Sequence, residues 1–428
     1  MVDDLAVGGV DDTVTLRLAD QDIKIYKNYE VRCSVLQQPA AFSLRLGWAS
    51  NAAELLAKFP PNTPFQLRIG RSTIMSGVTY GRAQPSADRT EIEIKGRDYL
   101  SRLFDDTLEF DTKYTEKTYY ALTRRILDDA GLKEQGGRFK LIDNNDGNRE
   151  LITRTPAKGR KKQAVAQQET GATAGQGKLV YQTIEGQVGK TRMQFLNEHY
   201  KLAGLFLWST GDGNFVLSRP TADLAPGYRI NRARGKVREQ GDAVGCEFVD
   251  DVTERHARYV CYGKAGAKGL KGEFIDTEMV GYGFDHVLVF EDNDAKNKEQ
   301  ADFIARKKCA DARRAGWKLS YTVSGHIRPS LANPGKQAVW SYDMTCDVQD
   351  EILNLHDIFY VEEVIYRRAP QTTSSVNLLR PQDLVWADGQ FSKPAEVLKP
   401  NTEKKSDLYT KPHALIPMPI KIRQSGRF

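Results

Sequence analysis

The alternation of apolar and polar residues is clearest in residues 64–105. Apolar side chains occupy every second position over 65–69 and again over 91–95, and 72–80 lies between them as a further expected strand. A period of two is typical of half-buried strands. Gly96 then leads into an expected helix over Arg97–Phe104.

The same period of two occurs earlier in the chain, over 14–18, 23–25, 31–35 and 42–48. A short helix is expected over 52–59, where Pro60-Pro61 ends it. Six or so strands within about ninety residues favour a small closed or nearly closed barrel. We therefore expect a tube-like β-barrel domain over 13–105, preceded by an N-terminal arm over 1–12.

A helical period appears in the next part of the chain. Apolar residues share one face over 115–130 and again over 190–203, and Gly131 and Gly204 follow as expected helix stops. Strands are expected over 139–142 and 180–184, and a hairpin over 205–218 turns at its Gly-Asp-Gly. These elements predict an α+β domain over 106–235.

Strand patterns return after residue 235. They cover 258–262, 287–290, 317–327, 338–347, 358–367 and 372–379, with one long helix expected over 293–315. This predicts a second tube-like β-barrel domain over 236–380, although no repeat is visible in the sequence itself. The fold class expected is α+β, mainly β: two barrels flank an α+β domain, and an extended, proline-rich segment over 381–428 follows.

Residues 153–178 stand apart in composition. They hold six basic residues and one acidic residue, and their apolar content is little more than alanine. Such a segment has too little apolar surface to pack, which indicates an insertion or a mobile loop. Its basic residues are either simply solvated or contact an acidic partner or nucleic acid. The candidate contact residues are Arg154, Lys158, Arg160, Lys161 and Lys162.

Composition excludes several classes of protein. Of the 428 residues, 40% are hydrophobic and 28% charged, and the net charge of +6 is too mild to mark a nucleic-acid binder. No apolar run reaches the roughly 18 residues of a membrane span, and the acidic start of the chain is no signal peptide. The five scattered cysteines have no metal-ligand spacing, so we expect buried, reduced thiols.

No catalytic constellation emerges from the motifs. Gly189-Lys190-Thr191 resembles the end of a phosphate-binding loop, but Ile184 stands where the first glycine is needed, which favours a plain loop and helix start. The six histidines are isolated, and Glu362 and Glu363 point to opposite faces if their segment is a strand. We expect no enzyme activity, no cofactor and no bound metal.

Several stretches in a fixed order resemble the Mu-type tail hub (baseplate hub) family of tailed phages and its relatives in contractile injection machines. The resemblance covers most of 13–381. It is carried by TVTLRLADQDIKIYKNYEVRCSV, AAFSLRLGW, TEIEIKGRDYLSRLFD, the helix over 115–131, GKTRMQFLNEHYKLAGLFLWSTGDGNFVLSRP, ARYVCYGK and FYVEEVIYRRAPQTTSSVNLLRP.

The resemblance implies a structural virion protein at the tail tip or baseplate. Three copies would form a ring whose six barrels join a six-fold tail tube to a three-fold central spike. The implied partners are two further copies of the chain, the spike, the tail tube or its initiator, the tape-measure protein and the baseplate wedge proteins. The tape measure and then DNA would pass through the lumen, and the tail is expected to be contractile.

Two features depart from the family pattern: loop 153–178 and the segment after Pro381 both look longer than usual. The apolar residues near the chain's end are suited to lying on the spike or an adjacent hub subunit, and they are Leu415, Ile416, Pro417, Met418, Pro419 and Ile420. Three other functions stay open: a hub-like part of a contractile injection system, a tail-associated cell-wall hydrolase, and a nucleic-acid binder using loop 153–178.

Deletion of residues 401–428 should weaken assembly of the hub with its spike and leave the fold intact, because the prolines of this segment reduce the entropy lost on ordering. Co-purification of the spike with the full and shortened chains measures this. Equal recovery of spike by both chains would contradict the prediction.

Overall fold

The computed structural model describes residues 11–385 with gaps, and the N-terminal arm before residue 11 and the C-terminal segment after residue 385 lie outside it. The gaps are 19–20, 25, 37–38, 48–59, 81–83, 86–90, 110–112, 117, 144–183, 187, 234–242, 264–269, 293–294 and 296. The helix expected over 52–59 and the basic loop 153–178 fall in these gaps.

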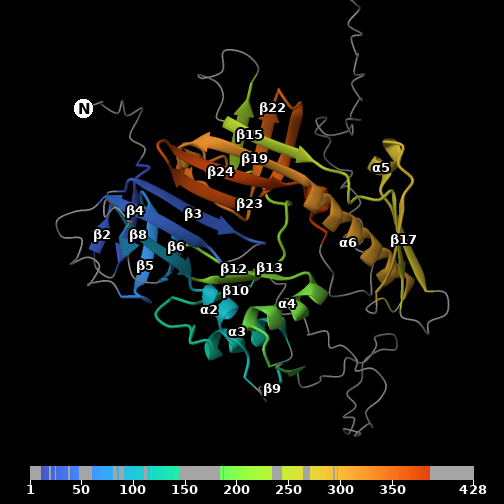
Figure 1. Ribbon diagram of the computed structural model, residues 1–428, viewed down its shortest axis with the longest axis horizontal. Coiled ribbons are helices and arrows are strands. Elements are labelled where there is room, and N and C mark those ends of the chain that lie inside the picture. Colours follow the sequence, from blue (N-terminus) through green and yellow to red (C-terminus); the bar gives the residue numbers. More distant parts are fainter. Residues whose placement is uncertain are drawn as a thin grey trace, which may run out of the picture. The chain divides into compact units, whose positions relative to one another are not determined.

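Fourteen strands form one large sheet, and the remaining described strands form smaller ones, so the expected mainly-β class is confirmed (Figure 1). The described strands do not close into a barrel. The large sheet contains β1 (Val14–Leu18), β2 (Gln21–Ile23), β3 (Asn28–Ser34), β4 (Ala41–Gly47), β5 (Pro64–Ile69), β6 (Ser72–Thr79), β7 (Gln84–Pro85), β8 (Glu91–Asp98), β14 (Tyr228–Arg232), β15 (Ala243–Asp250), β19 (Trp317–Ser324), β22 (Met344–Asp350), β23 (Leu355–Arg368) and β24 (Thr372–Leu379).

The large sheet contains the same strand arrangement twice. The first repeat consists of β1, β3, β4, β5, β6 and β8, and the second of β14, β15, β19, β22, β23 and β24. Each repeat has six strands, counted from first to sixth along the chain. In both repeats these strands lie side by side in the order second, third, sixth, fifth, fourth, first. All neighbours are antiparallel except β14 and β22, which run parallel where β1 and β5 run antiparallel.

The two repeats are joined into one sheet by β3 and β23. These strands pair antiparallel over six positions, from Glu363 opposite Ser34 to Arg368 opposite Tyr29. In Figure 1 the blue β3 lies beside the orange-red β23. A single hydrophobic core draws on both repeats, including Val31 and Leu44 from the first and Val364 from the second. The two repeats therefore form one continuous sheet over one core.

A middle unit lies between the repeats in the sequence. Two of its helices match those expected: Thr118 caps α3, Thr191 and Gln194 form a capping box on α4, and Gly204 ends α4 in a left-handed conformation. The short helix α2 starts later than expected, because Arg97 and Asp98 still belong to β8. The elements are α2 (Ser101–Asp105), β9 (Lys113–Tyr114), α3 (Tyr119–Asp129), β10 (Leu141–Asp143), β11 (Ile184–Glu185), α4 (Arg192–Ala203), β12 (Phe206–Ser209) and β13 (Phe215–Ser218).

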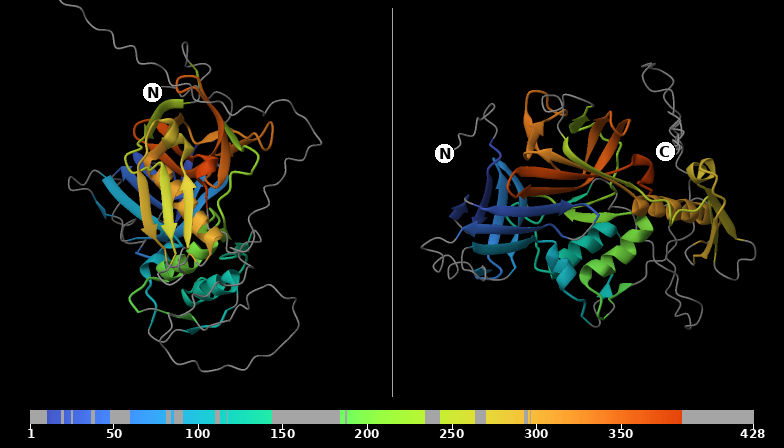
Figure 2. Two further views of the ribbon diagram at one scale, coloured as in Figure 1. Left: turned by 90° about the vertical axis from the view of Figure 1, so that its right-hand side faces the viewer. Right: turned by 45° about the horizontal axis from the view of Figure 1, so that its top comes forward.

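An inserted module interrupts the second repeat between β15 and β19. It consists of β16 (Arg258–Tyr262), β17 (Lys271–Ile275), α5 (Thr277–Gly281), β18 (Val287–Glu291) and α6 (Lys298–Gly316). Figure 2 shows α6 running alongside the three-stranded sheet. The approach is close: a Cβ at Gly272 would lie 2.1 Å from the backbone carbon of Ala301, so only glycine fits there.

The strand expected over 338–347 is divided. Gln337–Val339 forms β21, which pairs with β20 (Ile327–Pro329), and β22 begins only at Met344. Asp343, between them, has a left-handed backbone, with φ of 57°, and this turns the chain into β22. A short 3-10 helix, η1 (Pro381–Asp383), follows β24 as α2 follows β8.

Asp98 ties the first repeat to the middle unit. One of its carboxylate oxygens accepts the backbone N–H of Ala40 at 3.2 Å and the hydroxyl of Ser209 in β12. Burial raises the pKa of Asp98 from 3.8 to about 6, even though these hydrogen bonds act in the opposite direction. At neutral pH, ionisation of the buried Asp98 carboxylate therefore lowers the stability of the folded protein.

Substituting Asp98→Asn should stabilise the protein more at pH 7 than at pH 4. The raised pKa means that the folded state binds a proton between pH 4 and 6 that the unfolded state has released, so stability from this group falls as the pH rises through that window. The expected change in the mutant-minus-wild-type difference between the two pH values is about 2 kcal/mol. Urea unfolding at both pH values measures it. Asp285→Asn, at a fully exposed carboxylate, serves as the control, and a difference independent of pH for Asp98→Asn would contradict the prediction.

Candidate functional site

The candidate functional site is the junction between β3 and β23, where two repeats of one chain meet. On its inner face Val31 and Cys33 are fully buried, and so is Val364 opposite Cys33. Burial also raises the pKa of the Cys33 thiol, so this cysteine acts as a small apolar side chain. The inner face of the junction is thus closed hydrophobic core.

The outer face of the junction carries paired charges. Arg367 contacts Glu30 at 2.9 Å, and Arg32 contacts Glu363 at 3.2 Å, each pair reaching from one repeat to the other. Glu363 is only 2% exposed and also accepts a hydrogen bond from the amide of Asn377. Burial raises the pKa of Glu363, and the nearby Arg32 counteracts this. Because one acid and one base come from each strand, the pairs oppose a shift in register.

A bulge allows β23 to serve two neighbours on one edge. Its first part, Leu355–Val361, pairs with β22, and its second part, Glu363–Arg368, pairs with β3. The residue left over at the change of partner is Glu362, where the register to β24 shifts. The carbonyl of Glu362 accepts the N–H of Val35, so the bulge itself is bonded to the first repeat.

A buried histidine closes one end of the junction. The ring nitrogens of His326 lie 2.8 Å from the hydroxyl of Tyr29 in β3 and 2.8 Å from that of Ser374 in β24. Its backbone N–H also donates to the carboxylate of Asp12 at 3.0 Å. Burial lowers the pKa of His326 to about 4, so the ring is neutral at pH 7 and acts as a hydrogen-bonding link between the repeats.

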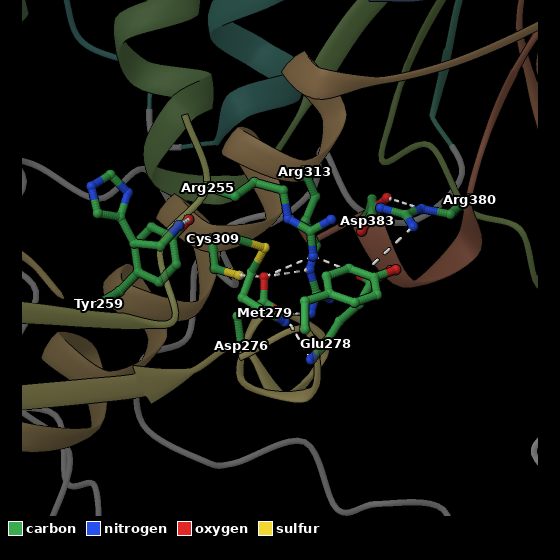
Figure 3. A network of polar contacts seen from close by, with 11 residues as sticks. Arg255, Tyr259, Asp276, Glu278, Met279, Cys309, Arg313, Arg380 and Asp383 are labelled. Carbon is green, nitrogen blue, oxygen red and sulfur yellow. Dashed lines mark hydrogen bonds and ion pairs between the residues drawn. The ribbon is translucent and has the colours of Figure 1, made fainter. Parts of the chain in front are cut away.

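A balanced network of charges anchors the inserted module (Figure 3). Asp276, at the start of α5, bonds Arg255 at 2.9 Å and Arg313 of α6 at 2.6 Å. Arg255 also bonds Glu278 at 2.6 Å, and Arg380 bonds Asp383 of η1 at 2.7 Å. The three arginines face three carboxylates, and Arg380 also lies 4.0 Å from Glu278, which joins η1 to the rest of the network.

The electrostatics of this network favour structure over catalysis. Burial alone would raise the pKa of Asp276, but hydrogen bonds from Arg313 and Arg255 outweigh it and hold the pKa at about 2. The Cys309 thiol lies 3.4 Å from Asp276, and burial raises its pKa to about 12. A permanently ionised acid and a protonated thiol have no acid–base or nucleophilic role at neutral pH.

The described residues show no further site for chemistry. They contain no group of three or more His, Cys, Asp or Glu side chains that could hold a metal ion. Gly189-Lys190-Thr191 forms a turn followed by the cap of α4, as expected for a plain helix start. Within the part of the chain that the structure covers, no helix has the length and apolar character to cross a membrane.

Both sets of residues proposed from sequence lie outside the described residues. This holds for the apolar segment over 415–420 and for the basic residues over 154–162. Both sets therefore stay predictions. Sequence reasoning missed the junction, which pairs residues over three hundred positions apart, and the charge network, which joins four separate segments. The only signal was the charge of alternate outer-face positions in β3.

The fold is shared with known tail proteins. The 43 kDa tail protein of prophage MuSo2 from Shewanella oneidensis superimposes with a TM-score of 0.66 at 16% identity, covering 87% of this chain and 99% of that one. A tail protein from Neisseria meningitidis MC58 gives 0.66 at 16% identity, covering 88% and 98%. The Francisella PdpA–VgrG complex in its half-lidded form gives 0.51 at 9% identity, covering 87% of this chain and 58% of that one. No protein-family model and no curated protein sequence matches the chain.

These neighbours define the class of fold. Two of them are tail proteins, one of them from a prophage, and both are matched over nearly their whole length. At identities this low the likeness concerns the fold, and the function has to be argued from the repeats and their junction.

Substituting Arg255→Met should lower the free energy of unfolding by about 3–5 kcal/mol, because it leaves the buried Asp276 and the partly buried Glu278 with one cation fewer. Urea unfolding followed by tryptophan fluorescence measures this, since Trp317 lies beside Arg380 of the network. Arg125→Met is the matched control, because Arg125 is 60% exposed in an i,i+4 pair and should contribute under 1 kcal/mol. Similar losses in both variants would contradict the structural role of the network.

Proposed function

We propose that this chain is the hub of a phage tail, forming a trimeric ring at the tail tip that joins a six-fold tube to a three-fold spike. The observation that carries the proposal is the pair of repeats with one strand order, joined edge to edge in a continuous sheet. Three chains with two such repeats each supply six similar positions around an axis. Closed rings are the usual outcome of head-to-tail contacts whose rotation closes.

The two repeats correspond, in this proposal, to the two tube-like barrel domains expected over 13–105 and 236–380, with the α+β domain expected over 106–235 between them, except that β14 (Tyr228–Arg232) of the second repeat lies before residue 236. The likeness to tail proteins from Shewanella and Neisseria supports this assignment at the level of fold. The proposed location is the tip or baseplate of the virion tail.

We assign the polar face of the continuous sheet to the channel. Across β19 and β24 this face carries small polar side chains, among them Ser320, Thr322 and Ser375. Across the junction and the first repeat it carries neutralised pairs, such as Arg45 with Glu93. A surface of short polar groups and paired charges offers little to hold a passing chain or DNA. The tape-measure protein and then DNA are the proposed cargo.

The remaining proposed partners are the central spike, the tube or its initiator, and baseplate wedge proteins. The C-terminal segment with Leu415–Ile420 is the proposed spike contact, and loop 153–178 is a proposed contact for an acidic partner. An enzyme role as a cell-wall hydrolase finds no support among the described residues, where no candidate acid, base or nucleophile stands in a catalytic arrangement.

A second candidate function is a hub-like component of a contractile injection system. The likeness to the PdpA–VgrG complex favours it, and the chain spans 58% of the matched chain there. Under this alternative the chain would work with a spike carried on the same or another polypeptide. The tube and sheath proteins that co-purify with the chain would distinguish this alternative from a contractile or non-contractile phage tail.

The mass of the purified chain in solution tests the proposal. Light scattering should give three times the 48.1 kDa of one chain for the chain alone, or three copies of the chain per complex after mixing with the candidate spike and tube proteins, because a ring of six repeats needs three copies. Electron-microscope averages of the trimer should show six similar lobes. A chain that stays monomeric under all of these conditions would contradict the hub.

A further inference from the structure

The three-stranded sheet of the inserted module has one closed edge and one open edge. Its strands lie side by side in the order β17, β16, β18 (Figure 2). On the β17 side, the carboxylate of Asp302 in α6 accepts the backbone N–H of Glu273 at 2.7 Å, and Gly272 packs against the backbone of α6. On the β18 side, no strand lies beside Val287–Glu291 among the described residues.

The hydrogen bonds at the ends of β18 show which of its backbone groups face the open edge. Arg258 donates its N–H to the carbonyl of His286 at 3.2 Å, and Asp292 donates its N–H to the carbonyl of Tyr262 at 2.9 Å. β16 and β18 run parallel between these two bonds, and only every second residue of a strand bonds a given neighbour. The first, third and fifth residues of β18 therefore direct their N–H and C=O groups away from β16.

The side chains along this edge are uncovered as well. Val289 is 58% exposed and Val287 is 45% exposed. Val260 of β16, which pairs with Val289, is only 3% exposed, because a strand lies on each side of it. β18 carries neither lysine nor proline, the residues that commonly protect an edge strand from pairing. A further strand beside β18 would cover Val289 as Val260 is covered now.

Charge indicates which kind of strand would fit. Asp285 and Glu291 are exposed near the two ends of β18. Arg258 and Lys271, which share this face of the sheet, both bond Glu273 on the opposite edge strand, at 2.7 and 3.2 Å. The open edge is thus apolar at its centre and acidic at both ends. This arrangement suits an extended strand with alternate apolar residues and a basic residue toward each end.

We propose that β18 accepts an extended segment of another tail protein, which adds to the sheet of the inserted module as a fourth strand. The segment has apolar residues at alternate positions and lysine or arginine near both ends. That the donor is a tail protein rests on the proposed hub function, whereas the chemistry of the segment follows from β18 itself. The inserted module is then an attachment point for a partner, distinct from the strands of the two repeats.

Hydrogen exchange on the full-length chain tests the site with two defined probes. One is a blocked seven-residue peptide of alternating valine and threonine with lysine at each end, and the other has glutamate at each end. The lysine peptide should slow exchange of the outward-facing amides of β18 at a concentration at least tenfold lower than the glutamate peptide, and added salt should reduce this difference. Equal effects of the two peptides, or no protection by either, would overturn the proposal.

A pair of variants separates the edge of the sheet from its face. Val289→Lys should raise the concentration of lysine peptide needed for protection at least tenfold, because it places a cation at the centre of the contact. Ile275→Lys is the matched control and should leave binding unchanged, because Ile275 is 51% exposed on the same face but lies on the closed edge strand β17. Thermal melting verifies that both variants fold. Equal losses in the two variants would overturn addition at the edge.

The assembled complex with spike, tube and wedge proteins supplies the third measurement. The amides of β18 should exchange more slowly in this complex than in the trimer of the chain alone. Unprotected β18 amides in the complex would overturn the strand addition and leave the hub proposal standing. Protection already present in the trimer alone would identify a second copy as the occupant and would also overturn it. Peptide binding by a chain that never forms a trimer would support the site on β18 and overturn the hub.

Discussion

The structure depends on the pairing of β3 with β23. This ladder is the place where two repeats become one sheet, and its inner side chains belong to a core that both repeats share. Neither repeat can therefore be displaced without opening the core of the other. A sheet edge is the least protected part of a β-structure, and here one edge of each repeat is used to complete the other within the chain.

β23 pairs with two strands along one edge by forming a bulge. The inserted module is anchored by a set of buried charges. At Glu362 the backbone gives up one ladder position so that β23 can change neighbours. Around Asp276 three arginines and three carboxylates join α5, α6 and η1. Buried ion networks add little net stability but penalise every other arrangement of the same segments.

Local features of this fold could be predicted from the sequence, and the long-range ones could not. The helical period and glycine stops located α3 and α4, and alternation located β16 and β24 with their observed bounds. The predicted start of α2 was wrong, because residues just before a helix can still complete a strand. The junction depends on a pairing between residues over three hundred positions apart, and alternation within each strand carries no information about which neighbour it takes. The candidate contacts over 154–162 and 415–420 lie in segments with too little local pattern to place.

The two repeats differ in the direction of their first strand. β14 lies parallel to β22, whereas β1 lies antiparallel to β5, although the other five strands follow the same order. In a ring built from three chains, the first-strand position would alternate between two forms, while the other positions would look alike at every step. A partner that touches the common strands would meet six equivalent places, and one that touches the first strand would meet three. The same ring could thus present six equivalent places to one partner and three to another, because a single five-residue strand runs in different directions in the two repeats.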